Sequence, residues 1–160
     1  MGGAGKTMGI GLVCGFVVLS LLSMAVQGWL SHRPVKVGLV DGRLADCPKS
    51  PNCVSSDAPA GKHRVSPLAK PSQDGVTLAD VKATIQALPR TRIVDSRDDY
   101  LHAEFESLIF RFVDDLEVHA RPARDEIAVR SASRVGHWDM GTNRRRVERL
   151  RRRLEQHRAH

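Results

Sequence analysis

Aromatic side chains are scarce in this chain of 160 residues and make up 4% of it. Surfaces that stack nucleic-acid bases or cage cationic ligands are built from aromatic rings, so the sequence offers little material for either. Cysteine is scarce too, with three residues, none of them after residue 53. The folded part therefore has no cysteine nucleophile, and it also lacks a Ser-His-Asp order with a nucleophile elbow.

Positive charge is abundant but local. The net charge is +7, and residues 144–160 supply +6 of it, with eight arginines against Glu148 and Glu155. This run has three interpretations: a solvated helix face, a surface for anionic lipid headgroups, or a nucleic-acid surface. An exported domain would not meet nucleic acid, so we do not expect nucleic acid as a partner. If the domain faced the cytoplasm, nucleic acid would instead be favoured over the other interpretations.

Charge is absent from residues 8–30, an apolar run of 23 residues that is long enough to span a bilayer. A signal peptide would be cleaved after Ser23-Met24-Ala25, whereas a signal anchor would keep the helix with Trp29 at the membrane interface. We favour the anchor, because the apolar run continues past the candidate cleavage site. Residues 1–30 are therefore predicted to be the membrane segment, and the lipid bilayer is the first expected partner.

Cys47 and Cys53 enclose five residues that include two prolines. Two cysteines make a poor zinc site, and this spacing is not the C-x-x-C of redox enzymes. We predict a disulfide in an oxidising compartment, with two free thiols as the alternative. Together with the export segment, this places the protein in the inner membrane with its globular part facing the periplasm.

Residues 31–75 contain six of the eight prolines and are predicted to be an extended arm laid over the domain, or a linker, and not a second core. Residues 76–160 are predicted to form the α+β domain. Its first helix begins at Thr77, which caps it with Asp80 three residues on, and ends at Pro89. A last helix begins near Thr142 or Asn143, either of which can cap it. It buries an apolar stripe of Val147, Leu150 and Leu154.

Four strand-like runs lie between these helices, at residues 92–95, 100–105, 109–121 and 126–135. The third run alternates strictly between apolar and charged side chains. Its register would aim Asp114 into the core, and a bulge at Asp114-Asp115 would avoid this burial. The fold class is therefore α+β: an antiparallel sheet of about four strands, with helices packed on one side and one transmembrane helix in front.

If residues 122–125 form a hairpin loop, Glu117 lies opposite Arg130 and Asp114 lies opposite Ser133. The first pair is expected to be a surface ion pair that contributes under about 1 kcal/mol. Asp114 differs, because a buried carboxylate needs hydrogen-bond donors or a positive partner.

Four separated motifs resemble the domain of unknown function 1499 family, at residues 47–56, 112–117, 130–136 and 139–144. The resemblance covers roughly residues 44–154. It implies a small domain, often membrane-tethered or lumenal, with no established activity and no catalytic residue to transfer. It also implies that the following residues belong to a family pattern: Asp114, Arg130, Ser131, Ser133, Arg134, Asp139, Asn143 and Arg146.

The predicted site gathers polar residues where two strands meet the start of the last helix: Asp114, Ser131, Ser133, Arg134, Asp139, Asn143 and Arg146. A helix N-terminus with arginine and hydroxyl groups can hold an anion. Three interpretations stay open: an anion site, a structural junction in which Asp114 accepts bonds from Ser133 and the backbone, and an acid/base role for Asp114. Strand alternation points Arg134 away from the two serines.

A metal site from His102, Asp115, Glu117 and His119 is conceivable, since the last three share one strand face. Such a stripe is more typical of a solvated surface, so we expect no metal and no cofactor. We expect a membrane-anchored, envelope-facing binding or accessory domain rather than an enzyme, with anionic lipid headgroups or an envelope protein as partner. The alternative is an enzyme of unknown reaction centred on Asp114 and Arg134.

Overall fold

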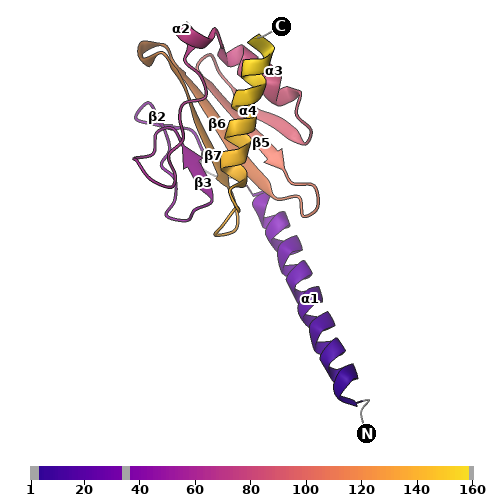
Figure 1. Cartoon of the computed structure of the whole chain (residues 1–160). Helices are drawn as coiled ribbons and strands as arrows, with labels where there is room; N and C mark the ends of the chain where they lie inside the picture. Colours follow the sequence, from indigo (N-terminus) through magenta and orange to yellow (C-terminus); the bar gives the residue numbers. More distant parts are fainter. Residues whose placement is uncertain (1–3, 34–36, 159–160) are drawn as a thin grey trace.

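A long helix, α1 (Ala4–Ser31), extends from a globular body in the computed structural model, which describes residues 4–33 and 37–158. Figure 1 shows α1 projecting from one end of that body. Residues Gly11–Ser31 have a mean hydropathy of 1.9 and are long and apolar enough to cross a membrane or to serve as a signal sequence. Residues 1–3 of the predicted membrane segment, residues 34–36 of the predicted arm and residues 159–160 lie outside the described residues.

Five antiparallel strands form the main sheet, in the order β3-β7-β6-β5-β4. The strands are β3 (Cys53–Ser55), β4 (Thr91–Ser96), β5 (Tyr100–Glu106), β6 (Val113–Arg121) and β7 (Glu126–Ser133). The last four correspond to the predicted runs, and the α+β class is confirmed. The predicted count of about four is one too low, because the Pro-rich arm contributes β3, which pairs with β7.

The predicted register of the central hairpin is confirmed. Asp114 lies opposite Ser133 and Glu117 opposite Arg130, and the 3-10 turn η1 (Pro122–Arg124) makes the loop. The expected bulge at Asp114-Asp115 is wrong, because β6 pairs without interruption with both β5 and β7 there. The predicted start of this run at residue 109 is also wrong: residues 107–112 form a loop.

Two helices cover one face of the sheet. The helix α3 (Leu78–Gln86) has the predicted capping box of Thr77 and Asp80, and α4 (Thr142–Arg158) carries the predicted buried stripe. Between them and the sheet lies the main core. A one-turn helix, α2 (Pro71–Asp74), precedes α3. Figure 1 shows α4 running along the sheet, with its C-terminal end at the opposite end of the domain from α1.

A small hairpin covers part of the other face. Its strands are β1 (Leu39–Val40) and β2 (Arg43–Leu44), and Leu44 packs with Tyr100 and Ala128 in a second, small core. The charged stripe on this face is buried: Asp115 is 3% exposed and Glu117 0%. The expected solvated surface is therefore wrong, because a segment with little apolar periodicity folds over the stripe.

The predicted disulfide is present between Cys47 and Cys53, whose Cα atoms lie 5.6 Å apart. It closes the loop that leads into β3, and Cys53 itself pairs with Ala132 of β7. The bridge therefore fixes the arm at the point where it joins the sheet.

Candidate functional site

Asp114 and Arg146 form an ion pair between β6 and α4. Arg146 Nη2 donates to Asp114 Oδ2 at 2.5 Å, and each side chain is 13% exposed. The same guanidinium donates to Ser131 Oγ at 2.9 Å and lies 4.8 Å from the centre of the Phe105 ring. Asp114 keeps its place on the core face without a bulge because Arg146 neutralises its charge there.

Asn143 connects the sheet, the arm and α4 through one fully buried amide. Its Nδ2 donates to Asn52 O and to Ser133 Oγ, both at 2.9 Å, and its Oδ1 accepts from Ser131 Oγ at 2.6 Å. Asp139 accepts from the backbone N–H groups of Gly141 and Asn143, at 2.9 and 2.7 Å. Asp139 thus binds the N-terminal amides of α4, in place of the predicted caps Thr142 and Asn143.

Six of the seven predicted site residues therefore meet, and we call them the polar junction: Asp114, Ser131, Ser133, Asp139, Asn143 and Arg146. Most of their hydrogen-bonding groups are used within the fold. The polar junction therefore joins helix, sheet and arm, while Asp114 and Arg146 also line a cleft described below.

Arg134 lies on the opposite face of the sheet, as strand alternation predicts. It donates to Asp115 at 2.7 and 2.9 Å, to Glu104 at 2.5 Å and to the Ser31 carbonyl oxygen at 3.1 Å. The pair of Asp114 and Arg134 on which the enzyme alternative was centred is therefore not formed. Arg134 instead ties the sheet to the end of α1.

Arg134 belongs to a layer of buried and half-buried charged and polar groups on this face, which we call the ionic layer: Tyr100, His102, Glu104, Asp115, Glu117, Arg130 and Arg134. Glu117 accepts from Arg130 at 2.6 Å, from Tyr100 Oη at 2.8 Å and from Gly38 N at 2.7 Å. The Glu117–Arg130 pair does not lie at the surface as expected, because the Glu117 side chain is fully buried and that of Arg130 is 11% exposed. The buried Arg130 Nε has no partner in the described chain.

Burial and pairing shift several pKa values in and near this layer. Burial alone would raise the pKa of Asp115, but hydrogen bonds from Arg134 and His102 hold it below the usual value. Burial and the neighbouring Glu117 carboxylate raise the pKa of Tyr100, so its hydroxyl remains a donor. Burial and the adjacent Arg121 lower the pKa of His119.

The residues considered for a metal site, His102, Asp115, Glu117 and His119, have other partners. His102 Nε2 contacts Asp115 Oδ1 at 2.7 Å, while His119 accepts from Arg121 Nε at 3.0 Å. Within residues 4–33 and 37–158 there is no group of three or more His, Cys, Asp or Glu side chains placed to hold a metal ion.

A cleft of about 330 Å³ opens beside the polar junction, between the end of α3, β5 and the first turns of α4. Four arginines line it, and we call it the arginine cleft: Arg90, Arg145, Arg146 and Arg149. Leu88, Phe105 and Leu150 add apolar walls. Sequence reasoning missed Arg90, which lies in the turn between α3 and β4 and belongs to no periodic pattern.

The charges of the arginine cleft are unbalanced. Of its two carboxylates, Glu106 pairs with Arg111 and Asp114 with Arg146. Arg90 and Arg145 donate only to neutral oxygens, those of Glu106 O, Met140 O and Thr142 Oγ1. Arg149 is exposed. Arg90 interacts electrostatically with Glu106, whose carboxylate is already hydrogen-bonded to Arg111. Arg145 and Arg149 have no carboxylate partner among the described residues, so four arginines face two carboxylates and the cleft can hold an anion.

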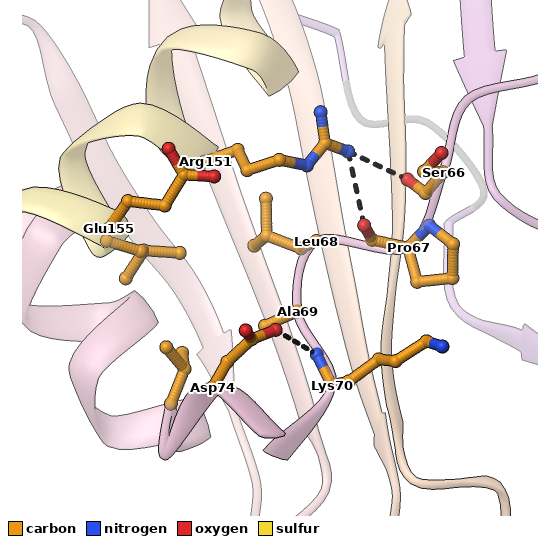
Figure 2. Close-up of a pocket in the computed structure, with 10 residues that line it drawn as sticks. Ser66, Pro67, Leu68, Ala69, Lys70, Asp74, Arg151 and Glu155 are labelled. Atoms are coloured by element: carbon orange, nitrogen blue, oxygen red, sulfur yellow. Dashed lines mark hydrogen bonds between the residues drawn. The ribbon is translucent and has the colours of Figure 1, made fainter. Parts of the chain in front are cut away.

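A second pocket, of about 340 Å³, is shown in Figure 2. There Arg151 donates to the carbonyl oxygens of Ser66 and Pro67, at 2.9 and 3.1 Å. Arg144 binds the carbonyl oxygens of Lys62 and Arg64 in the same manner. These two arginines of α4 therefore hold the arm against the helix, so the basic run is only partly a solvated face.

One family model matches this chain. The model of the family described as "Protein of unknown function (DUF1499)" matches residues 43–154. The chain belongs to this family. The match covers the disulfide, the sheet, the polar junction and nearly all of α4, and it excludes α1. No curated protein and no solved structure matches the chain. The DUF1499 domain brings no reaction or ligand with it, so its function is argued from the site.

Proposed function

We propose that this DUF1499 protein is a membrane-anchored binding module that faces the periplasm and binds an anionic group in the arginine cleft. The apolar helix α1 supports anchoring in the inner membrane. The Cys47–Cys53 disulfide supports an oxidising compartment for the globular part.

The observation that carries the binding role is the excess of arginine in one cleft. Four arginines line the cleft against two carboxylates, Glu106 and Asp114, and Arg145 and Arg149 have no carboxylate partner among the described residues. Arginine binds phosphate and carboxylate groups through paired N–H donors, and such charge-assisted bonds are among the strongest in proteins. An anionic ligand would relieve the repulsion between these cations.

The walls of the cleft narrow the ligand class. Leu88, Phe105 and Leu150 lie beside the arginines, so the cleft suits an anionic group carried on a partly apolar body. A lipid headgroup, an envelope polymer and an acidic protein segment all present phosphate or carboxylate groups. We propose this shared chemistry as the recognition feature.

Binding is a better account than catalysis by Asp114. The carboxylate is 9% exposed at the residue level and is engaged by Arg146, while Arg134 lies on the other face of the sheet. A general base must reach the proton that it abstracts, and Arg146 already occupies the Asp114 carboxylate.

The test compares two charge reversals on α4. Full-length protein in phosphatidylcholine nanodiscs is titrated with pyrophosphate while thermal unfolding is followed. R145E/R149E reverses two cleft arginines, and R152E/R153E makes the same charge change at exposed positions outside the cleft. Pyrophosphate should raise Tm for the wild type and for R152E/R153E but not for R145E/R149E, because a ligand stabilises only the state that binds it. Equal responses of all three proteins would refute the proposal.

A further inference from the structure

Two loops leave the sheet beside the last turn of α1. Glu106 pairs with Val113, and Asp114 pairs with Ser133. The last residues of β5, the first of β6 and the last of β7 therefore lie together at one end of the sheet. Val113 N donates to Ser31 Oγ at 3.0 Å, so this end of the sheet contacts α1. The β5–β6 loop (107–112) and the β7–α4 loop (134–141) therefore lie at the end of the domain from which α1 extends (Figure 1).

These two loops carry most of the exposed large apolar side chains of the globular part. Leu108 is 72% exposed and Ile109 78%, while Trp138 is 67% and Met140 70% exposed. In residues 37–158 only Val40 and Val94 join them among exposed large apolar side chains. Scattered apolar residues are normal on a protein surface, whereas large exposed apolar patches mark interaction sites. Four of the six exposed large apolar side chains of residues 37–158 lie in the two loops at this end of the domain. We call this group the apolar base: Leu108, Ile109, Trp138 and Met140.

Cationic side chains accompany the apolar base. Arg111 lies in the β5–β6 loop, where it pairs with Glu106, and Arg145 donates to the carbonyl oxygen of Met140 at 2.8 Å. Arg33 follows α1 and stacks over Trp29, with 5.4 Å from guanidinium carbon to ring centre. Tryptophan and arginine side by side are typical of the zone between acyl chains and headgroups.

The length of α1 determines where the two loops lie relative to the bilayer. The apolar span Gly11–Ser31 has 21 residues, which as a helix is about 30 Å long and matches the hydrocarbon thickness of a bilayer. Its C-terminal end therefore lies at the bilayer boundary when α1 spans the membrane. The β5–β6 loop touches that end, since His32 Nε2 lies 3.0 Å from Arg111 O.

We infer that the apolar base lies in the headgroup region of the same membrane that α1 crosses, so that the domain is seated on the bilayer rather than held away from it by a tether. The inference rests on the anchoring part of the proposed function and does not require an anion in the arginine cleft, although Arg145 borders both. The bilayer is the partner because the loops that carry the base contact the end of the spanning helix. The C-terminal end of α4 lies at the opposite end of the domain from α1, so its arginines do not contact this membrane surface (Figure 1).

The test uses Trp138 as its own probe. Trp29→Phe leaves Trp138 as the single tryptophan of the full-length chain, which has two. The protein is reconstituted into phosphatidylcholine–phosphatidylglycerol vesicles, with and without lipids brominated near the glycerol end of the acyl chains. Brominated lipid should remove most of the Trp138 emission. The matched control is W29F/W138F/V40W, which moves the indole to the β1–β2 hairpin, and its emission should not change.

Each outcome separates the inference from the anchor. Extraction with alkaline carbonate reports whether α1 holds the chain in the bilayer. Retention with strong quenching at Trp138 alone supports the inference. Retention without quenching at Trp138, or with equal quenching of the V40W indole, overturns it and leaves the anchor standing. Release of the chain by carbonate overturns both.

Discussion

Gly28, in the last turn of α1, lies directly against the backbone of Phe110. A Cβ atom built on Gly28 would lie 2.0 Å from the Phe110 carbonyl oxygen, a separation that no real contact allows. The absence of a side chain therefore lets α1 pack against the β5–β6 loop. Ser31, one helical turn later, accepts a hydrogen bond from Val113 N and donates to Gly28 O. The apolar helix is thus joined to the sheet by specific contacts.

Gly28→Ala should separate α1 from the sheet, because the backbone of Phe110 cannot yield to the added methyl group. The Val113 amide, which Ser31 protects, should then exchange its hydrogen faster in full-length protein in nanodiscs. Gly15→Ala is the matched control, since nothing lies within 4 Å of a Cβ placed there. Equal exchange at Val113 in both variants would show that the close approach of Gly28 is not needed.

Asp114→Asn should destabilise the domain by about 3 kcal/mol, because it leaves the Arg146 guanidinium in a mostly buried position without its counter-charge. Glu148→Gln removes one partner of the more exposed Glu148–Arg151 pair and should cost under about 0.5 kcal/mol. Chemical denaturation of the full-length protein in detergent compares the two. A wild-type stability for Asp114→Asn would contradict the structural role of this pair and would reopen an acid/base role for Asp114.

Stability should fall as the solution is acidified, in two stages. Burial and Arg121 hold the pKa of His119 below its ordinary value, so the unfolded chain binds the proton first and stability declines from about pH 6.5 downward. Below about pH 4 a second loss follows. It arises because arginine and other donors hold the pKa values of Asp57, Glu104 and Asp115 low against the opposing effect of burial.

Unfolding midpoints in guanidinium chloride between pH 7.5 and pH 3 test this dependence. Substitution His119→Gln should flatten the first stage, since glutamine does not titrate, and leave the second stage unchanged. Asp99, Asp57 and Arg121 interact with this imidazole and remain in the variant. A first stage as steep in His119→Gln as in the wild type would assign the proton uptake to another group.

Removing the disulfide should cost about 2 kcal/mol on the chain-entropy model, because the bridge closes a loop with a sequence separation of six. The Cys47→Ala/Cys53→Ala variant and the reduced wild type should unfold at the same, lower denaturant concentration. Cys14→Ala leaves the bridge intact and serves as the control, since Cys14 is a free cysteine. An unchanged midpoint on reduction would show that the loop is held without the bridge.

The elements that the sequence predicted well are those with a strong periodic signal. Strict alternation in β6 placed Asp114 opposite Ser133, because a strand repeats every two residues and one slip would reverse every side chain. The capping box at Thr77 marked the start of α3 for the same kind of local reason. Alternation also separated Arg134 from the two serines, although the family pattern lists all of them together.

The elements that it missed lack a local signal. β3 has three residues, too few to show alternation, and its pairing with β7 is a long-range contact. The sequence pattern of a charged strand face is the same whether water or the β1–β2 hairpin covers that face. The sequence therefore does not predict the burial of Glu117. The predicted strand begins too early, before the observed start of β6, because Phe110 and Phe112 continue the alternation of apolar residues. Arg111 adopts a positive φ of 56°, which is incompatible with extended structure at this point.

Native mass spectrometry of the full-length protein, extracted gently from its own membranes, shows whether the arginine cleft binds an anion. We expect an intact N-terminal helix, a mass two hydrogens below that of the reduced chain, and a bound phosphate- or carboxylate-bearing molecule. R145E/R149E should lose that molecule and R152E/R153E should keep it. A chain without the helix, fully reduced and carrying no anion, or an anion retained equally by both variants, would contradict the account.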